Sequence, residues 1–369
     1  MMKKIISLII SFVIIDLSFS LIAAENSSIN FTGNKIITVD DEPGDADFTS
    51  IKEALNFSSP GDTIEVYSGT YFEQGIHILN DNIILRGIAY ELGEGDDAGK
   101  PFIKGNGSES VIYVEASHVI VSNLIIENSE LGVSCIRIGM DWPGKVYNIT
   151  IRDCIIRNSS SIGIHIASKT GSIWNITIIN NNISHCKGIS FRGYAIPVNQ
   201  TSCIISGNVI TDSPQWGISF YGLSCIISGN VITDCRDMGI QLEKNSNNIS
   251  GNRIRQCEVG IQFEGADNIV YGNDIESCPV GILYYGRANI ITKNNFKNYS
   301  RIGYWFSRWF GEQFNVLLKS RWVGNYWDTW IGIGPKIILG LQAIGIGYIS
   351  VIPGFEFDLH PSKEPYDIS

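Results

Sequence analysis

Apolar and polar positions repeat along the centre of the chain with a period of 21 or 22 residues. Five segments align directly and share an asparagine at one place, at Asn208, Asn230, Asn252, Asn273 and Asn294. Looser copies precede them, with Asn181, Cys154 and Leu124 at the marker position. Between the markers, short segments alternate apolar and other residues, which is the period of a β-strand.

A glycine opens one such strand in each repeat, in segments such as GIHI (163–166) and GIQF (260–263). A unit of this size that already holds two or three strands has no room for a helix, and it can bury its apolar face only against its neighbours. The pattern predicts an all-β fold, a single-stranded right-handed parallel β-helix with one coil per repeat. A leucine-rich-repeat horseshoe would need a leucine-dominated pattern, which this chain lacks.

Most of the eight cysteines fall where stacked coils, about 4.8 Å apart, place like residues side by side. Cys235, Cys257 and Cys278 share one such ladder, and Cys203 and Cys225 share another. Because cross-coil geometry suits a disulfide poorly, the sequence favours buried free thiols over pairing.

The first residues have the layout of a secretory signal, with a basic start, an apolar run over residues 5–15 and small residues before position 25. An uncleaved anchor helix is the alternative, but Asp16 and nearby serines interrupt the run. We therefore predict a signal peptide at 1–24, an N-terminal extension and cap at 25–62, β-helix repeats at 63–300 and an aromatic-rich C-terminal capping region at 301–369.

Both ends of an open stack of strands need caps. At the start, Ser50 and Glu53 have capping-box spacing for a short helix, and a strand over Thr63–Val66 follows. At the other end lie five of the eight tryptophans, and the apolar segment 337–352 is too short and too glycine-rich to span a membrane comfortably. We expect that segment to form capping strands, and we expect no integral membrane domain after signal removal.

Charged residues make up 17% of the chain, and its formal net charge is −10. A chain so apolar is not disordered, and a chain so acidic and without a basic stripe is not expected to bind nucleic acid. Eleven N-x-[ST] sequons fit an exported, glycosylated surface. These sequons lie at Asn26, Asn30, Asn56, Asn106, Asn148, Asn158, Asn175, Asn182, Asn199, Asn248 and Asn298.

The stretch VDDEPGDADFTSIKEALNFSSPGDTIEVYSGTY (39–71) resembles the opening of archaeal pectin-lyase-like β-helix surface proteins. Residues 120–299 resemble NosD-like repeats, which are also described as carbohydrate-binding and sugar-hydrolase-type repeats, and WVGNYWDTW (322–330) is similar to the C-terminus of many such archaeal proteins. The resemblance implies a pectin-lyase-like solenoid and an exported location. It implies no particular activity, since a fold does not fix a function.

On each glycine-initiated strand, the residues between and after the inward apolar positions should point outward and form two parallel exposed ladders on one sheet. The second ladder lies two residues after the first and includes Arg192, Tyr221 and Tyr285. Their mixture of aromatic, amide, carboxylate and guanidinium groups suits a sugar, since rings stack on aromatic faces and polar groups hydrogen-bond hydroxyls. The candidate substrate-binding residues are Arg137, His165, Tyr194, Tyr221, Gln241, Gln262, Tyr285 and Trp305.

Glu243 and Glu264 fall on adjacent coils, with Cα atoms roughly 5 Å apart. With Arg192, they are the candidate catalytic residues. Carboxyl groups about 5–5.5 Å apart suit a retaining glycosidase and wider pairs an inverting one, and two close carboxylates raise one pKa. The alternative is a pair of solvated glutamates on an exposed strand, since no flanking motif supports catalysis.

Two acidic stretches, 40–47 and 91–97, could bind calcium through oxygen ligands. The candidate ligands are Asp40, Asp41, Asp45 and Asp47. Neither stretch matches an EF-hand loop, and solvated loops are the alternative interpretation.

Two further activities implied by the resemblance have little support in the residues. Polysaccharide lyases of this fold use calcium-binding acids beside a basic residue, and the nearest group here, around Arg137, Asp141 and Asp153, is sparse. The NosD-like name suggests copper, but the five histidines are scattered without paired spacing.

The sequence therefore predicts an exported β-helix protein, extracellular or at the cell surface, that binds a polysaccharide or cell-envelope glycan, or packs in the envelope, without catalysis. A polysaccharide hydrolase or lyase is the alternative, and a NosD-like copper or metallocluster maturation factor is a second. The glycan and the oligomeric state stay open.

Overall fold

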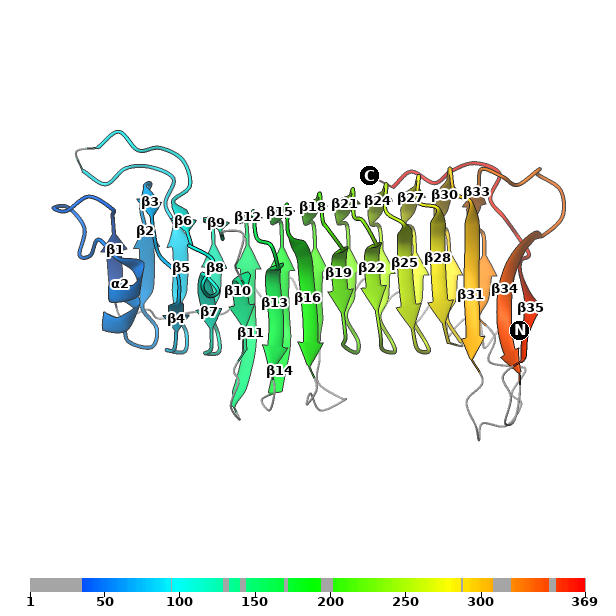
Figure 1. Cartoon of the computed structure of the whole chain (residues 1–369), viewed down its shortest axis with the longest axis horizontal. Helices are drawn as coiled ribbons and strands as arrows, with labels where there is room; N and C mark the ends of the chain where they lie inside the picture. The colour runs from blue at the N-terminus through cyan, green and yellow to red at the C-terminus, as the bar shows by residue number, and fades with distance from the viewer. Residues whose placement is uncertain are drawn as a thin grey trace, which may run out of the picture.

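The computed structural model describes residues 35–93, 95–128, 133–139, 144–168, 172–193, 202–286, 288–307, 320–344 and 350–368. The predicted signal peptide at 1–24 and Tyr194 lie outside the described residues. The described chain forms one elongated stack of short strands, with a helix at one end and a long hairpin at the other (Figure 1).

Each coil adds strands to three sheets, which we name A, B and C. Sheet A contains β1 (Ile36–Val39), β2 (Thr63–Val66), β5 (Ile84–Gly87), β8 (Ile120–Ser122), β11 (Lys145–Arg152), β14 (Ser172–Ile179), β17 (Cys203–Ser206), β20 (Ile226–Ser228), β23 (Asn248–Ser250), β26 (Ile269–Tyr271), β29 (Ile290–Thr292) and β32 (Arg321–Val323). Sheet B contains β3 (Thr70–Tyr71), β6 (Phe102–Lys104), β9 (Ile125–Glu127), β12 (Ile155–Arg157), β15 (Asn182–Ser184), β18 (Val209–Thr211), β21 (Val231–Thr233), β24 (Arg253–Arg255), β27 (Asp274–Glu276), β30 (Asn295–Lys297) and β33 (Tyr326–Trp327). Sheet C contains β4 (Ile76–Ile78), β7 (Ile112–Val114), β10 (Ser134–Ile138), β13 (Ile162–Ser168), β16 (Lys187–Gly193), β19 (Trp216–Phe220), β22 (Met238–Leu242), β25 (Val259–Glu264), β28 (Val280–Tyr285) and β31 (Arg301–Ser307).

Neighbouring coils pair in parallel, and the repeat markers stay in register. The predicted parallel β-helix is confirmed. The stack already includes β1, which lies inside the stretch predicted as the N-terminal extension and cap and pairs with β2.

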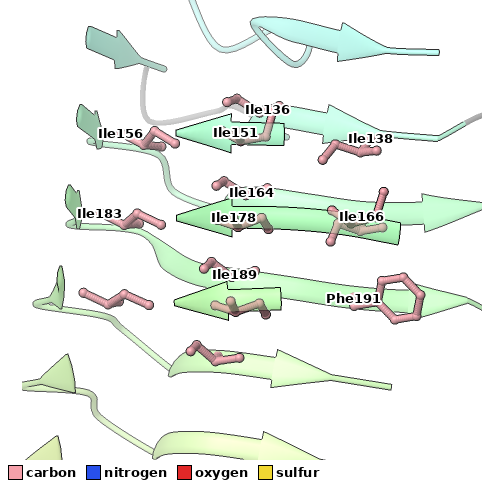
Figure 2. Packing of buried hydrophobic residues seen from close by; sticks show 14 of the residues in the cluster. Ile136, Ile138, Ile151, Ile156, Ile164, Ile166, Ile178, Ile183, Ile189 and Phe191 are labelled. Carbon is pink, nitrogen blue, oxygen red and sulfur yellow. The ribbon is translucent and has the colours of Figure 1, made fainter. Parts of the chain in front are cut away.

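The core consists of inward-facing apolar residues that stack on the same residue type in the next coil. Ile136 lies beside Ile164, and Ile164 beside Ile189, on three successive strands of sheet C. All three are fully buried, and Figure 2 shows them with the isoleucines of sheets A and B filling the interior. Because side chains alternate along a strand, a slip of one residue would turn these residues outward, so the apolar pattern fixes the register.

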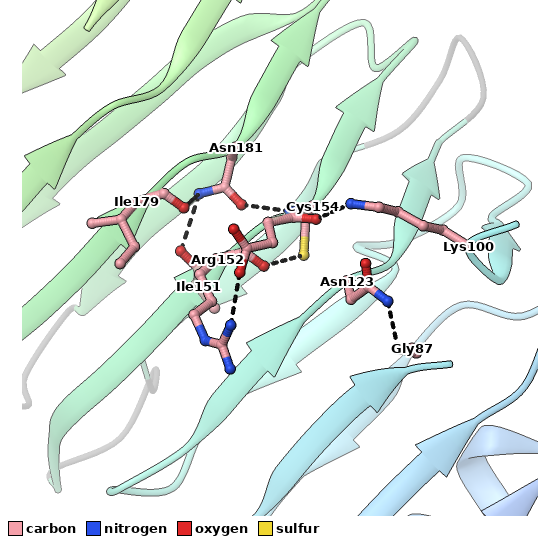
Figure 3. A network of polar contacts seen from close by, with 9 residues as sticks. Gly87, Lys100, Asn123, Ile151, Arg152, Cys154, Ile179 and Asn181 are labelled. Atoms are coloured by element: carbon pink, nitrogen blue, oxygen red, sulfur yellow. Dashed lines mark hydrogen bonds and ion pairs between the residues drawn. The ribbon is translucent and has the colours of Figure 1, made fainter. Parts of the chain in front are cut away.

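A ladder of buried asparagines, the asparagine ladder, follows the core along one corner of the coils. Its first rung is drawn in Figure 3, where Asn181 accepts a hydrogen bond from the Cys154 backbone N–H at 3.0 Å and donates to the Ile151 and Ile179 carbonyls. The same bonding continues through the later coils. The other members are Asn208, Asn230, Asn252, Asn273, Asn294 and Asn325.

The asparagine ladder ends on a carboxylate. Asp358, which is fully buried, accepts hydrogen bonds from the Asn325 backbone and side-chain N–H groups at 2.9 and 3.0 Å and from Trp327 Nε1 at 3.2 Å. An aspartate suits this position because an ionised carboxylate only accepts hydrogen bonds.

Glycines at the starts of the sheet C strands allow neighbouring coils to approach closely. A Cβ atom added at Gly217 would lie 2.6 Å from Ile232 Cγ2 and 2.8 Å from the Gly239 carbonyl oxygen. Any side chain there would force the coils apart. Glycine therefore recurs at this position because the space between neighbouring coils admits no Cβ atom.

The N-terminal helix is α2 (Ile51–Phe57), as predicted, and β2 follows over the predicted residues. Ser50 Oγ accepts the Glu53 backbone N–H at 3.3 Å. The Glu73 carboxylate accepts the Ile51 and Lys52 N–H groups at 2.9 and 3.0 Å, so a residue from the next coil completes the cap.

At the C-terminus, β34 (Lys336–Ile344) and β35 (Ser350–Asp358) form an antiparallel hairpin, which confirms capping strands in this apolar segment. The tail then returns along sheet B (Figure 1). Tyr366 exchanges two backbone hydrogen bonds with the Asn295 side chain, both 2.8 Å, and the Ile368 carbonyl accepts from Arg253. The tail therefore holds several coils together.

All eight cysteines are buried and free, as predicted.

Candidate functional site

The outer face of sheet C carries two parallel rows of polar and aromatic side chains. The first row runs across successive coils in register through His77, Tyr113, Arg137, His165, Ser190, Ser219, Gln241, Gln262 and Leu283. The second row lies two residues further along each strand and includes Glu115, Ala167, Tyr221, Glu243, Glu264 and Tyr285, and the backbone of Arg192 lies at the same position on β16. The predicted ladder therefore exists, but it is not exposed as expected: Ser190 and Ser219 are buried, and most of the other residues of the first row are half-buried.

Hydrogen bonds connect the two rows in the later coils. Ser219 Oγ donates to Gln241 Oε1 at 3.2 Å, and Gln241 Nε2 donates to Glu243 Oε1 at 3.4 Å. Lys244 Nζ lies 4.1 Å from the centre of the half-exposed Tyr221 ring. These contacts hold amide, carboxylate and aromatic groups together on one surface.

The two candidate catalytic glutamates are brought together. Burial raises the pKa of Glu264, the negative charge of Glu243 raises it further, and Lys244 opposes the shift. Burial and the Glu264 charge also raise the pKa of Tyr285, which pairs with Glu264 on the next strand. A carboxyl group with a raised pKa can hold a proton at a pH where an ordinary glutamate cannot.

Three further predicted site residues have different outcomes. Arg192 lies on β16 with its backbone beside Ala167, as the predicted second ladder requires, and Tyr194 lies outside the described residues. The expectation that Trp305 follows Leu283 in the first row is wrong. The register shifts on β28, so that Gly303 lies beside Leu283 and Trp305 comes two residues later.

Sequence reasoning missed the N-terminal end of this face. His77 and Tyr113 extend the first row, and Glu115 extends the second. Gly75 and Ile76 precede His77 in a GIHI segment identical to residues 163–166, so the strand motif could have located it. The 36-residue spacing from His77 to Tyr113 differs from the regular period, and Val111 takes the place of the opening glycine on the Tyr113 strand, so the match was hidden.

The two acidic stretches converge at the N-terminal end of the solenoid. Carboxylates of Asp40, Asp41 and Glu42 form one close group, and those of Glu42, Glu91 and Asp97 form another, with ligand atoms within 4.8 Å of one another. Both carboxylate oxygens of Glu91 are buried without a hydrogen-bond partner. This is the type of oxygen-rich group that calcium binds.

Burial and the charges of Glu91, Glu42 and Asp41 raise the pKa of Asp40 to about 7. Asp45 and Asp47, the other predicted calcium ligands, are not in these groups. Asp47 accepts hydrogen bonds from the Thr38 N–H at 3.0 Å and its hydroxyl at 3.2 Å, and the backbone bond lowers the pKa of Asp47. Calcium binding at Asp40 and Asp41 stays a prediction, with Glu42, Glu91 and Asp97 as added ligand candidates.

The sparse lyase-like group is not assembled in the described residues. Arg152 pairs with Asp153 at 2.7 Å at the end of a sheet A strand, whereas Arg137 lies on sheet C. Asp141 lies outside the described residues.

Comparison of the sequence with known families identifies one match. The family described as "NosD: Periplasmic copper-binding protein (NosD)" matches residues 146–332. A search of curated proteins finds no match. Within the described residues, no helix is long and apolar enough to cross a membrane.

The described residues do not fit a copper site. Copper is held by thiolates, imidazoles and thioethers, but the cysteines are buried, and burial raises the pKa of Cys154 to about 11, which disfavours the thiolate. His77 is bonded to Glu115 and His118 to Asn148. The close groups of three or more possible ligands found among the described residues consist only of carboxylates.

Two of the solved structures that match this chain are named as a lacto-N-biosidase and a polysaccharide lyase. The lacto-N-biosidase of Eubacterium ramulus matches with a TM-score of 0.51 and 13% identity, over 77% of this chain and 65% of that enzyme. This chain thus spans less than two thirds of the enzyme's length. A mannuronic acid specific lyase of family 6 from human gut microbiota matches with a TM-score of 0.48 and 14% identity, over 79% and 80% of the two chains.

At 13% identity, the likeness to the lacto-N-biosidase shows the fold alone, a right-handed parallel β-helix. The family match covers half of the chain and lies on the coils that carry the asparagine ladder. By this match, the chain belongs to the NosD family.

Proposed function

We propose that this protein binds an extended glycan along the outer face of sheet C and acts as an exported β-helix surface protein without catalysis. The periplasmic description of the family and the leader predicted at residues 1–24 support export. The glycan is a polysaccharide or an envelope glycan that meets a new pair of side chains at every coil.

One observation carries the proposal: aromatic and hydrogen-bonding side chains recur in register on the later coils. Tyr221 and Tyr285 offer faces on which sugar rings stack, and Gln241, Glu243 and Glu264 offer groups that hydrogen-bond hydroxyls. Coils about 4.8 Å apart repeat this mixture along the axis, which suits a linear polymer.

Binding to a panel of neutral and acidic polysaccharides, by affinity electrophoresis, tests the proposal. We expect Tyr221→Ala to weaken binding roughly tenfold, since losing one stacking contact costs on the order of 1 kcal/mol. The matched control is Phe72→Ala, which removes an aromatic ring that is 77% exposed on another part of the surface. Absence of binding by the unaltered protein, or equal losses in both variants, would contradict the proposal.

Hydrolysis is a second candidate, favoured by the raised pKa of Glu264 beside Glu243. In that case Glu264 donates the proton to the leaving oxygen, and Glu243 acts as nucleophile or base. This activity is measured as the formation of shorter sugars from any glycan that the protein binds. Glu264→Gln should then lower the rate at least about 100-fold, whereas binding without turnover in the unaltered protein would leave only the binding function.

A further inference from the structure

Within the described residues, β1 is the first strand of sheet A, so one of its edges faces away from the coils. On the other edge, the Lys35 and Val39 carbonyls accept the Thr63 and Tyr67 N–H groups at 2.9 and 2.8 Å. Backbone groups alternate in direction along a strand, so those of Thr38 point to the outer edge. All four residues of β1 are β-branched, which favours strand pairing. An edge of this type is a template for another chain unless it is covered.

The loop that follows β1 covers this edge with a carboxylate. The Thr38 N–H and hydroxyl both donate to Asp47 Oδ2, at 3.0 and 3.2 Å. In return, Thr38 Oγ1 accepts the Asp47 N–H at 2.9 Å, and the Thr38 carbonyl accepts the Phe48 N–H at 3.1 Å. Asp47 and Phe48 therefore occupy the place where a neighbouring strand would pair, and Asp47 adds a negative charge there.

The same loop covers the first strand of sheet B. On β3, Gly69 and its neighbours pair with β6, so the Thr70 N–H points away from the coils and donates to Asp41 Oδ2 at 3.0 Å. A Cβ atom added at Gly69 would collide with the Asp41 carboxylate, so the glycine leaves the space that this carboxylate fills. Helix α2 packs against β4, the first described strand of sheet C. Two aspartates and one helix therefore cover the first described coil.

The C-terminal end is covered in a different way, by backbone. Strand β34 pairs with β31, and β35 pairs with β32 between Asp358 and Trp322. Ser362 of the tail forms a bridge with Tyr326 on β33. A second copy could add a strand at this end only after these elements unfold, whereas at the N-terminal end two side chains are enough to prevent pairing.

We propose that Asp41 and Asp47 block the first coil against pairing with the first coil of a second copy of this chain. Contact between two N-terminal ends is isologous, so it closes after two copies and yields a dimer instead of a filament. The backbone bond from Thr38 lowers the pKa of Asp47, which keeps this carboxylate ionised at neutral pH. The block is therefore both a hydrogen-bond partner and a charge that repels the same charge on the other copy.

The mass of Asp47→Ala in solution, measured by light scattering after size exclusion at rising protein concentration, tests the proposal. EDTA is present throughout, so that calcium at the same loop does not contribute. We expect a species of about twice the mass at concentrations at which the unaltered protein keeps its mass. The matched control is Asp96→Ala, which removes an equal charge from the exposed loop after β5 and should keep the mass of the unaltered protein.

Asp41→Ala is the second variant, should Asp47→Ala fail to fold. It removes the partner of the Thr70 N–H and leaves the bonds of Thr38 in place, so we expect a smaller fraction of the doubled species. Hydrogen exchange of residues 36–39 at low protein concentration measures the block itself. It should be about tenfold faster in Asp47→Ala, because one hydrogen bond is lost, and it should slow again as the dimer forms.

A folded Asp47→Ala that keeps the mass of the unaltered protein overturns the proposal, and the same result for Asp41→Ala decides the question if Asp47→Ala is unfolded. A doubled mass in Asp96→Ala also overturns it, because loss of charge alone would then account for association. If the mass of Asp47→Ala doubles while exchange of residues 36–39 stays fast, the contact lies elsewhere and the pairing of first coils is wrong.

Discussion

At the scale of single residues, one asparagine per coil satisfies backbone groups that the corner of the solenoid would otherwise bury unpaired. Asn230 accepts two hydrogen bonds from Asn208, both 3.0 Å, and its Nδ2 donates to the Ile205 carbonyl and to Asn252 Oδ1, both 2.9 Å. It is fully buried. Asparagine recurs at this position because each side chain accepts hydrogen bonds from the asparagine of the preceding coil. These bonds connect neighbouring coils.

Asn230→Ala should therefore destabilise the protein by about 3 kcal/mol or more, because it leaves several buried polar groups without partners at about 1–3 kcal/mol each. The shift of the urea unfolding midpoint measures this loss. Asn248→Ala is the matched control. Its Oδ1 has no hydrogen-bond partner already, so its removal should cost less than about 1 kcal/mol. Similar losses for the two variants would show that the asparagine ladder contributes little.

At the scale of elements, the loops that follow β1 and β5 concentrate negative charge at the N-terminal end. Asp40 is 1% exposed and has its pKa raised to about 7 by burial and by the neighbouring carboxylates. An acid whose folded-state pKa is raised stabilises the fold only while it is protonated. Its contribution is fully present below its unfolded-state pKa and is lost as pH rises through about 7.

Asp40→Asn should consequently raise the melting temperature in EDTA at pH 8.5, where the unaltered protein carries the full repulsion. The gain should shrink as pH falls to 5, because the side chain at position 40 is then neutral in both folded proteins. Thermal melts at several pH values measure the difference. Added calcium should raise the melting temperature of the unaltered protein at pH 8.5 if the carboxylates bind it. A gain from Asp40→Asn that does not depend on pH would contradict the assigned titration.

At the scale of the whole molecule, one continuous core runs through the described coils and includes the thiols. Cys235, Cys257 and Cys278 lie in this core, and burial raises the pKa of Cys186 to about 12. A reagent that attacks thiolates needs both exposure and ionisation. The thiols therefore report on the unfolding of the solenoid.

We expect the native protein to show no rapid reaction with Ellman's reagent at pH 8. Eight thiols should react in guanidinium without a reductant, matching the eight free cysteines. Absorbance of the released thiolate gives the count. Fewer than eight in the denatured, unreduced protein would reveal disulfides and contradict the assignment of free thiols.

The repeat in the sequence determined the parallel β-helix, the cysteine and asparagine ladders and the meeting of Glu243 with Glu264. It could do so because stacked coils place residues that are one repeat apart side by side. The length of the repeat is therefore enough to identify which residues are neighbours on adjacent coils. The two capping strands were predicted from composition. The apolar segment 337–352 is interrupted by glycines and too short to span a membrane, and the last coil of an open stack needs a cover.

Only the tertiary structure decided features that depend on irregular coils. The shift on β28 moved Trp305 out of the first row, and unequal loops hid His77. Glu73 completes the helix cap and Glu91 joins Glu42 through contacts between coils. A loop of a different length changes the number of residues between equivalent positions on two coils. The repeat also carries no information about which loops contact each other.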